Sequence, residues 1–235
     1  MAARSARERP RHLIFDADDT LWENNIYFER AFDDFVAFLR HSTLDAGRIR
    51  AVLDEIEIAN ARVHGYGSLN FGRNLHQAYQ RLAERDVRPQ DRDIILQFAA
   101  RILEQPVELI DGVDETLAHL AAHYELTLFT KGDAEEQRLK VARSGVAGYF
   151  SHTAIVKEKD RDSYRSLVDQ RKFTPSQTWM IGNSPKSDIN PALEAGLNAV
   201  LIPHAHTWTL ERQEIREGPG QLIRLERFAE LRGCF

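Results

Sequence analysis

Hydrophobic positions follow two different patterns along this chain. From about residue 22 to residue 105, apolar residues recur every three or four positions, a spacing that predicts amphipathic helices. The sequence predicts four of them, around 28–39, 49–59, 75–82 and 94–102. Glycine-containing and proline-containing segments at 65–67 and 87–89 interrupt the pattern. Helices of this kind pack as a bundle.

After Pro106, short apolar runs alternate with helical segments. Strands are expected at 126–129, 154–156, 178–181 and 199–202, and helices at 113–123, 133–144, 161–170 and 187–195. This alternation is typical of a parallel sheet with helices on both faces. Another apolar run, at 13–15, precedes the helical block and predicts the first strand.

These patterns together predict an α/β protein with a Rossmann-like, parallel-sheet core. Residues 11–21 and 106–235 would form the core domain, and residues 22–105 an inserted α-helical domain. Residues 1–10 are expected to be a flexible tail. A length of 235 residues suits one large domain or two smaller ones.

Composition restricts the partners and the compartment. The chain has 31 basic and 36 acidic residues and no long basic stripe, which argues against nucleic acid as a partner. No apolar run reaches membrane-spanning length, and the basic N-terminus lacks the apolar segment of a signal peptide. The single cysteine, Cys234, leaves no internal disulfide. We expect a cytoplasmic protein, monomer or homodimer, that binds neither nucleic acid nor membrane.

The first strand leads directly into acidic residues. Asp16, Asp18, Asp19 and Thr20 lie at its C-terminal end, which is where open α/β sheets bind their ligands. Clustered carboxylates repel each other unless a cation or a shared proton intervenes. Mg2+ is the usual cation for an all-oxygen site beside a phosphate. The alternative is an acidic helix start, which the helix dipole favours.

Three further polar segments follow predicted strands. They are Thr130-Lys131-Gly132, the pair Lys157 and Lys159, and the segment from Gly182 through Asn183 to Asp188. Each also has an ordinary structural interpretation: a helix N-cap, a solvated charged loop and a helix start. With the Asp16 segment they lie at four strand ends, which indicates one shared site, because the carboxyl ends of parallel strands meet at one edge of the sheet.

The four segments resemble the motifs of the haloacid dehalogenase (HAD) superfamily. In chain order, the resemblance rests on Asp16-x-Asp18-x-Thr20, Leu128-Phe129-Thr130, Glu158-Lys159 with Tyr164, and Gly182-Asn183-Ser184 through Asp188 to Gly196. Order and spacing match across roughly residues 11–205. The helical insertion matches the position of the family's C1 cap.

The resemblance implies a catalytic role for each motif. Asp16 would be the nucleophile that forms an aspartyl-phosphate. Asp18 would protonate the leaving group and then activate water. Thr130 and the N–H group that follows it would bind phosphoryl oxygens. Lys159 would neutralise charge, and its spacing to Tyr164 favours it over Lys157 as the motif lysine.

The resemblance also implies a Mg2+ site. Its ligands would be Asp16, the backbone carbonyl of Asp18, Asn183 and Asp188. Many relatives carry Asp where this chain has Asn183, so one negative charge is missing. Whether Asn183 binds the metal directly is left open, and we expect modest Mg2+ affinity.

Substrate specificity is expected to come from the cap and from loops that face it. The candidate substrate-binding residues are Thr20, Asn24, Asn25, Arg62, Tyr66, Arg73 and Lys131, with Trp22 and Asn70 beside them. Arg62 and Arg73 have an alternative interpretation as surface arginines. His204 and His206 would need a third ligand to bind a second metal, and Trp208 is more simply explained as packing at the rim.

The predicted function is a Mg2+-dependent phosphatase that acts on a small phosphorylated metabolite. One alternative is a catalytically weak phosphate-binding or regulatory protein on the same scaffold, which Asn183 favours. Another is a 2-haloacid dehalogenase. The superfamily's dehalogenases lack an Asp two residues after the nucleophile, so Asp18 argues against that activity. The sequence leaves the substrate open.

Overall fold

A six-stranded parallel sheet forms the centre of the computed structural model, which describes residues 12–235 apart from the side chain of Arg62. The strand order is β3-β2-β1-β4-β5-β6. The strands are β1 (His12–Phe15), β2 (Glu125–Lys131), β3 (His152–Val156), β4 (Thr178–Gly182), β5 (Asn198–Leu201) and β6 (Leu222–Arg224). The predicted α/β, Rossmann-like fold class is confirmed. The sequence analysis missed β6, a three-residue edge strand.

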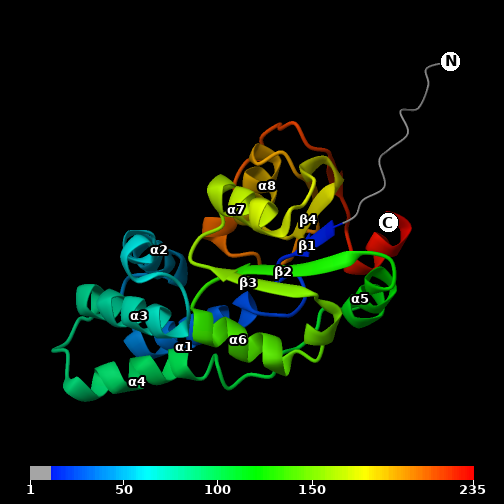
Figure 1. Cartoon of the computed structure of the whole chain (residues 1–235). Helices are drawn as coiled ribbons and strands as arrows, with labels where there is room; N and C mark the ends of the chain where they lie inside the picture. Colours follow the sequence, from blue (N-terminus) through cyan, green and yellow to red (C-terminus); the bar gives the residue numbers. More distant parts are fainter. Residues whose placement is uncertain (1–11) are drawn as a thin grey trace.

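Helices cover both faces of the sheet. They are α5 (Val113–Ala121), α6 (Ala134–Arg143), α7 (Arg161–Arg171) and α8 (Asn190–Glu194). In Figure 1, α7 and α8 lie above the sheet and α5 and α6 below it. Side chains of β1 alternate accordingly: Leu13 and Phe15 pack in the cluster that includes Leu117 of α5, and Ile14 packs with Leu167 of α7. Because both faces are buried, the strand reads as a continuous apolar run.

The segment between β4 and α8 differs from its prediction. Residues 187–195 were expected to form one helix. Instead, a single π-helical turn at Pro185–Ile189 leads into the short helix α8. The side chain of Ser184 caps this turn by accepting a hydrogen bond from the N–H of Ser187. The tight turn keeps Asp188 close to the end of β4.

Four helices form a separate cap beside the core. They are α1 (Asn25–Leu39), α2 (Ala46–His64), α3 (Ser68–Leu82) and α4 (Pro89–Ala100). They share their own hydrophobic cluster, which includes Phe35, Leu53, Leu75 and Ile95. Figure 1 shows this cap facing the carboxyl ends of the strands. In the part of the chain that the structure describes, no helix is long and apolar enough to cross a membrane.

Polar contacts join the cap to the core. The hydroxyl of Ser68, at the start of α3, donates to Glu136 of α6 at 2.6 Å. The hydroxyl of Tyr66 donates to Glu158 at 2.6 Å. The side-chain amide of Asn25 donates to the carbonyl of His206 at 2.8 Å. These contacts close a cavity between the cap and the edge of the sheet.

Candidate active site

The carboxyl ends of three neighbouring strands define the candidate site. β1 lies between β2 and β4, with Phe15 paired to Leu128 on one side and to Ile181 on the other. Asp16, Thr130 and Asn183 therefore emerge at the same edge. They line one cavity of about 1110 Å³ of empty space, counting the part open to solvent.

Lys159 is the centre of the site's electrostatics. Its side chain is 1% exposed, and its ammonium contacts Asp16 and lies 2.8 Å from Asp188 Oδ1. Burial alone would lower the pKa of Lys159, but the two carboxylates outweigh burial and raise it. Lys157 is exposed. The structure thus places Lys159, not Lys157, against the candidate nucleophile.

Asp188 is held in place by the loop after β4. Its Oδ2 accepts a hydrogen bond from the N–H of Ser184 at 2.9 Å. A Cβ atom added to Gly182 would lie 2.2 Å from the same oxygen, so only glycine leaves room for the carboxylate. Burial, together with the nearby Asp16, raises the pKa of Asp188 to about 7.

Thr20 lies beneath the cavity and contacts two of its residues. It is buried and is not among the residues that line the cavity, and its predicted role in substrate binding stays a prediction. Its Oγ1 lies 3.1 Å from Asp16 Oδ2 and 3.2 Å from Asn183 Oδ1. Asn183 in turn donates from its side chain to Thr207 Oγ1 at 3.0 Å. Thr20 therefore fixes the relative positions of Asp16 and Asn183.

Asp18 enters the same cavity but has separate partners. Lys140 Nζ lies 2.6 Å from both carboxylate oxygens, and Gln137 and Trp22 each donate to the carboxylate at 2.8 Å. Burial raises the pKa of Asp18, but Lys140 and the other donors outweigh it, so the pKa is lowered. The side chain of Asp18 is thus ionised and directed at α6.

Sequence analysis did not identify Lys140 or Gln137. Both lie on α6, three positions apart, on the side of that helix that faces Asp18. Polar residues on an amphipathic helix usually face solvent, so the type and spacing of Gln137 and Lys140 did not indicate that they contact Asp18. The one available signal was the position of α6 directly after the Thr130 segment.

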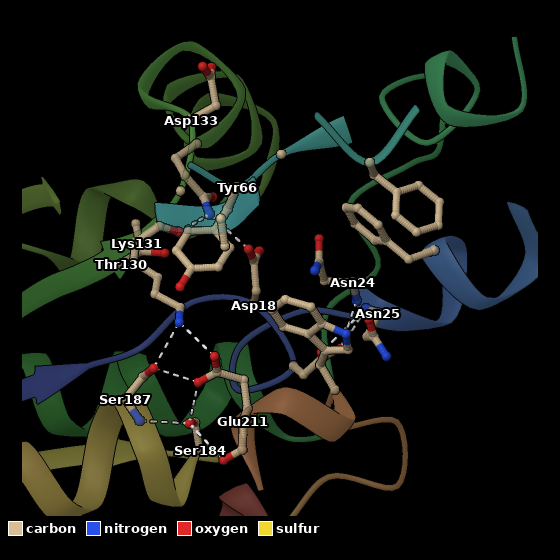
Figure 2. A pocket seen from close by; sticks show the side chains of 18 of the residues that line it. Asp18, Asn24, Asn25, Tyr66, Thr130, Lys131, Asp133, Ser184, Ser187 and Glu211 are labelled. Atoms are coloured by element: carbon tan, nitrogen blue, oxygen red, sulfur yellow. Dashed lines mark hydrogen bonds and ion pairs between the residues drawn. The ribbon is translucent and has the colours of Figure 1, made fainter. Parts of the chain in front are cut away.

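Lys131 is engaged by a residue that the sequence analysis also missed. Its ammonium lies 2.6 Å from Glu211 Oε1 and 2.9 Å from Ser187 Oγ, as Figure 2 shows. Glu211 is buried and also accepts a hydrogen bond from Ser184 at 2.6 Å. Burial raises the pKa of Glu211, but Lys131 and the serine donors outweigh it and lower the pKa. Lys131 lines the cavity and is paired with Glu211, and its predicted role in substrate binding stays a prediction.

The predicted cap residues divide into two groups. Asn24, Asn25, Tyr66 and Asn70 line the cavity. Arg73 is exposed, does not line the cavity and donates to Asn70 at 2.9 Å, which agrees with the alternative interpretation as a surface arginine. The side chain of Arg62 lies outside the described residues, and its role stays a prediction.

Aromatic side chains form part of the cavity wall. Trp208 lines it and packs edge-to-face against Tyr66, with ring centroids 6.1 Å apart. The ammonium of Lys131 lies 4.4 Å from the centre of the Tyr66 ring. Burial raises the pKa of Tyr66 to about 12, so its hydroxyl is protonated and donates to Glu158.

His204 lies beside two acidic residues that the sequence analysis did not connect with it. Among the described residues, Asp19, Glu23 and His204 place potential ligand atoms within 4.8 Å of one another. His206 is not part of this group, and its backbone N–H donates to His204 Nδ1 at 3.3 Å. Asp19 is already hydrogen-bonded to the N–H groups of Asn24 and Asn25, at 2.9 and 3.0 Å.

A family model supports the resemblance seen in the motifs. The model of the haloacid dehalogenase-like hydrolases matches residues 10–196, well over half of the chain. The chain belongs to the haloacid dehalogenase-like hydrolase family. The matched residues include all four segments that meet in the cavity of this HAD-like hydrolase.

Individual proteins resemble this HAD-like hydrolase in sequence or in structure. The HAD-hydrolase YfnB of Bacillus subtilis is 25% identical over 215 residues, which is 81% of this chain and 83% of YfnB. A crystal structure of a haloacid dehalogenase-like family hydrolase from Xanthomonas campestris has a TM-score of 0.81 and 29% identity, covering 96% of this chain and 94% of that one. N-acylneuraminate-9-phosphatase of Mus musculus is 28% identical over 102 residues, 41% of each chain.

Replacing Gly182 tests the packing beneath Asp188. In Gly182→Ala, the new methyl group would displace the buried carboxylate, so the free energy of unfolding should fall by about 1–3 kcal/mol. Gly148→Ala is the matched control, because a Cβ there has no atom within 4 Å. Its effect should stay within about 0.5 kcal/mol. Equal stability of the two variants in urea denaturation would contradict the close packing described above.

Proposed function

We propose that this HAD-like hydrolase is a Mg2+-dependent phosphatase that acts on a small phosphomonoester through an aspartyl-phosphate at Asp16. The observation that carries the proposal is the pair of carboxylates in one cavity, Asp16 against Lys159 and Asp18 against Lys140. Phosphate-ester cleavage uses one group as nucleophile and another for proton transfer. Halide leaves unprotonated, so a dehalogenase has no need for the second carboxylate.

The reaction divides into two displacements at phosphorus. In the first, a carboxylate oxygen of Asp16 forms a bond to phosphorus while the bond to the leaving alkoxide breaks. Asp18 supplies a proton to that alkoxide. In the second, Asp18 takes a proton from water, the water oxygen attacks the same phosphorus, and Asp16 leaves as a carboxylate. Lys159 offsets negative charge in both steps, and the Thr130 hydroxyl at the end of β2 offers a hydrogen bond to a phosphoryl oxygen.

The contact between Lys140 and Asp18 affects the two steps differently. The ionised carboxylate seen here is the form that activates water in the second step. Proton donation in the first step requires Asp18 first to take up a proton from solvent or from the entering substrate, which it can do once this ion pair loosens. Lys140 Nζ also lies 3.0 Å from Asn24 Oδ1, at the start of the cap. A movement of the cap would therefore change the position of Lys140 relative to Asp18.

The donor set at the sheet edge suits Mg2+. Asp16, Asp188 and Asn183 provide carboxylate and amide oxygens, and no His or Cys is among the described residues that line the cavity. Such all-oxygen sites favour Mg2+ over softer metals. When bound, Mg2+ would neutralise phosphoryl oxygens and help to orient the phosphate. A structure of YfnB is bound to magnesium, which supports the assignment by analogy.

The cap limits the size of the substrate. Four helices face the edge of the sheet, and polar contacts such as Ser68 with Glu136 join them to the core. A lid of this kind shields a reaction from water and selects what can enter. The proposed partner is therefore a small phosphorylated metabolite.

Replacing the nucleophile tests the proposed reaction. Wild-type protein with Mg2+ should release p-nitrophenol from p-nitrophenyl phosphate, and chelation with EDTA should stop it. Asp16→Asn should abolish turnover, because an amide does not form the acyl-phosphate. Asp18→Asn should lower kcat by about 10²–10⁴-fold. Asp169→Asn, an exposed position on α7, is the control and should retain full activity.

The same assay separates the alternatives. Chloride release from a 2-haloacid with no phosphate release would indicate a dehalogenase. Binding of inorganic phosphate without turnover of any ester would indicate a phosphate-binding protein. Either result would overturn the proposed phosphatase.

Introducing a carboxylate at position 183 tests the metal site. Asn183→Asp adds a negative charge beside Asp16 and Asp188, so Mg2+ should bind several-fold more tightly in isothermal titration calorimetry. Asn60→Asp adds the same charge in the cap and serves as the control. No gain in affinity at position 183, or an equal gain in both variants, would contradict the placement of Mg2+.

A further inference from the structure

The cavity has a second end, formed by the cap. Glu29 of α1 and Arg50 and Glu57 of α2 line the same cavity as Asp16. Glu57 is only 6% exposed, and its Oε2 has no hydrogen-bond partner among the described residues. A buried carboxylate oxygen without a partner carries a large desolvation penalty unless a ligand supplies one. The proposed mechanism does not use this group.

Carboxylates outnumber cations at this end. The guanidinium of Arg50 lies 2.7 Å from Glu29 Oε2 and 3.6 Å from the centre of the Phe32 ring, so its charge is already engaged. Asp54, less than one turn before Glu57 on α2, also has a buried oxygen without a partner. Of the described cap residues that line the cavity, Arg50 is the only one with a positive charge. Carboxyl groups at this wall therefore outnumber the positive charges that could pair with them.

The electrostatics around Glu57 agree with this geometry. Burial raises the pKa of Glu57 to about 8, and Asp54 and Glu29 add to the increase. Arg50 and a hydrogen bond from Trp208 oppose it. A cation placed beside Glu57 would relieve both the burial and the repulsion between carboxyl groups.

Aromatic rings beside this wall suit the same kind of ligand. Phe28 and Phe71 line the cavity and meet edge-to-face, with centroids 5.1 Å apart. The faces of such rings attract cations. Asn70 and Asn74 add amide groups to the lining. Carboxylates and ring faces together favour a cationic group that also donates hydrogen bonds.

We infer that Glu57 receives a protonated amine on the leaving group, so that the substrate is the phosphomonoester of an amino alcohol. The inference rests on the proposed phosphatase activity. With phosphorus at Asp16, the leaving group extends into the rest of the cavity, which the cap closes. An ammonium there supplies both a hydrogen-bond donor and the missing positive charge. A leaving group that ends in a carboxylate or a second phosphate would meet like charge.

Matched substrates test the inference directly. Wild-type enzyme is assayed with Mg2+ on a series of ω-aminoalkyl phosphates of increasing chain length, each paired with the uncharged alkyl phosphate and with the ω-carboxyalkyl phosphate. At the best length, kcat/KM for the amine should exceed that for the alkyl ester by about tenfold or more, the contribution of a charge-assisted hydrogen bond. The carboxylate series should be the poorest.

Variants locate the preference at one residue. Glu57→Gln keeps the shape but removes the charge, and it should reduce the ratio of kcat/KM between amine and alkyl ester to near one. Glu55→Gln, an exposed position on the same helix, should keep the wild-type ratio. The ratio is independent of how much folded enzyme each preparation contains.

The outcomes distinguish this inference from the proposed function. Hydrolysis of p-nitrophenyl phosphate by the wild type without any preference for amines would overturn the inference and leave the phosphatase standing. A preference that persists in Glu57→Gln would overturn the role of Glu57. Failure to hydrolyse any phosphate ester would overturn the proposed function and the inference with it.

Discussion

A single buried ammonium group holds the candidate site together. Lys159 is almost fully enclosed and lies between the carboxylates of Asp16 and Asp188. A charge at this depth is tolerated only when it is paired and hydrogen-bonded. Removing the carboxylate of Asp16 or of Asp188 would leave part of this buried charge uncompensated. Three segments distant in the sequence, after β1, β3 and β4, are fixed relative to one another by this requirement.

Other features of the site accommodate that arrangement. Gly182 leaves the space that Asp188 occupies, and the N–H of Ser184 binds the carboxylate oxygen that faces away from Lys159. Thr20 contacts the Asp16 oxygen that Lys159 does not contact, and it links this oxygen to Asn183. The oxygen atoms of Asp16, Asn183 and Asp188 are therefore positioned by Lys159, by backbone geometry and by the hydroxyl groups of Thr20 and Thr207. Such preorganisation reduces the rearrangement that a substrate phosphate would have to induce.

Much of the fold and part of the site could be predicted from the sequence. Both faces of the sheet are covered, so the strand at 13–15 is apolar throughout, and this continuous run is visible in the sequence. The carboxylates that follow it mark the edge where ligands bind. β6 gave no such signal, because three residues at the edge of a sheet show no periodicity. The partners of Thr20 and Lys131 could not be predicted, because they come from distant segments, Asn183 and Glu211, whose proximity only the fold reveals. The unpartnered oxygen of Glu57 likewise appears only once the cap is packed.

The position of the phosphoryl group is tested most directly by a crystal structure of the protein with Mg2+ and BeF3⁻, a mimic of the aspartyl-phosphate. We expect beryllium bonded to a carboxylate oxygen of Asp16, with Lys159 and the Thr130 hydroxyl within hydrogen-bond distance of the fluorides. Mg2+ should contact Asp16 and the Asn183–Asp188 segment. Beryllium fluoride bound elsewhere, or an Asp16 carboxylate left free in a crystal with BeF3⁻ at saturating concentration, would contradict the role of Asp16 as nucleophile.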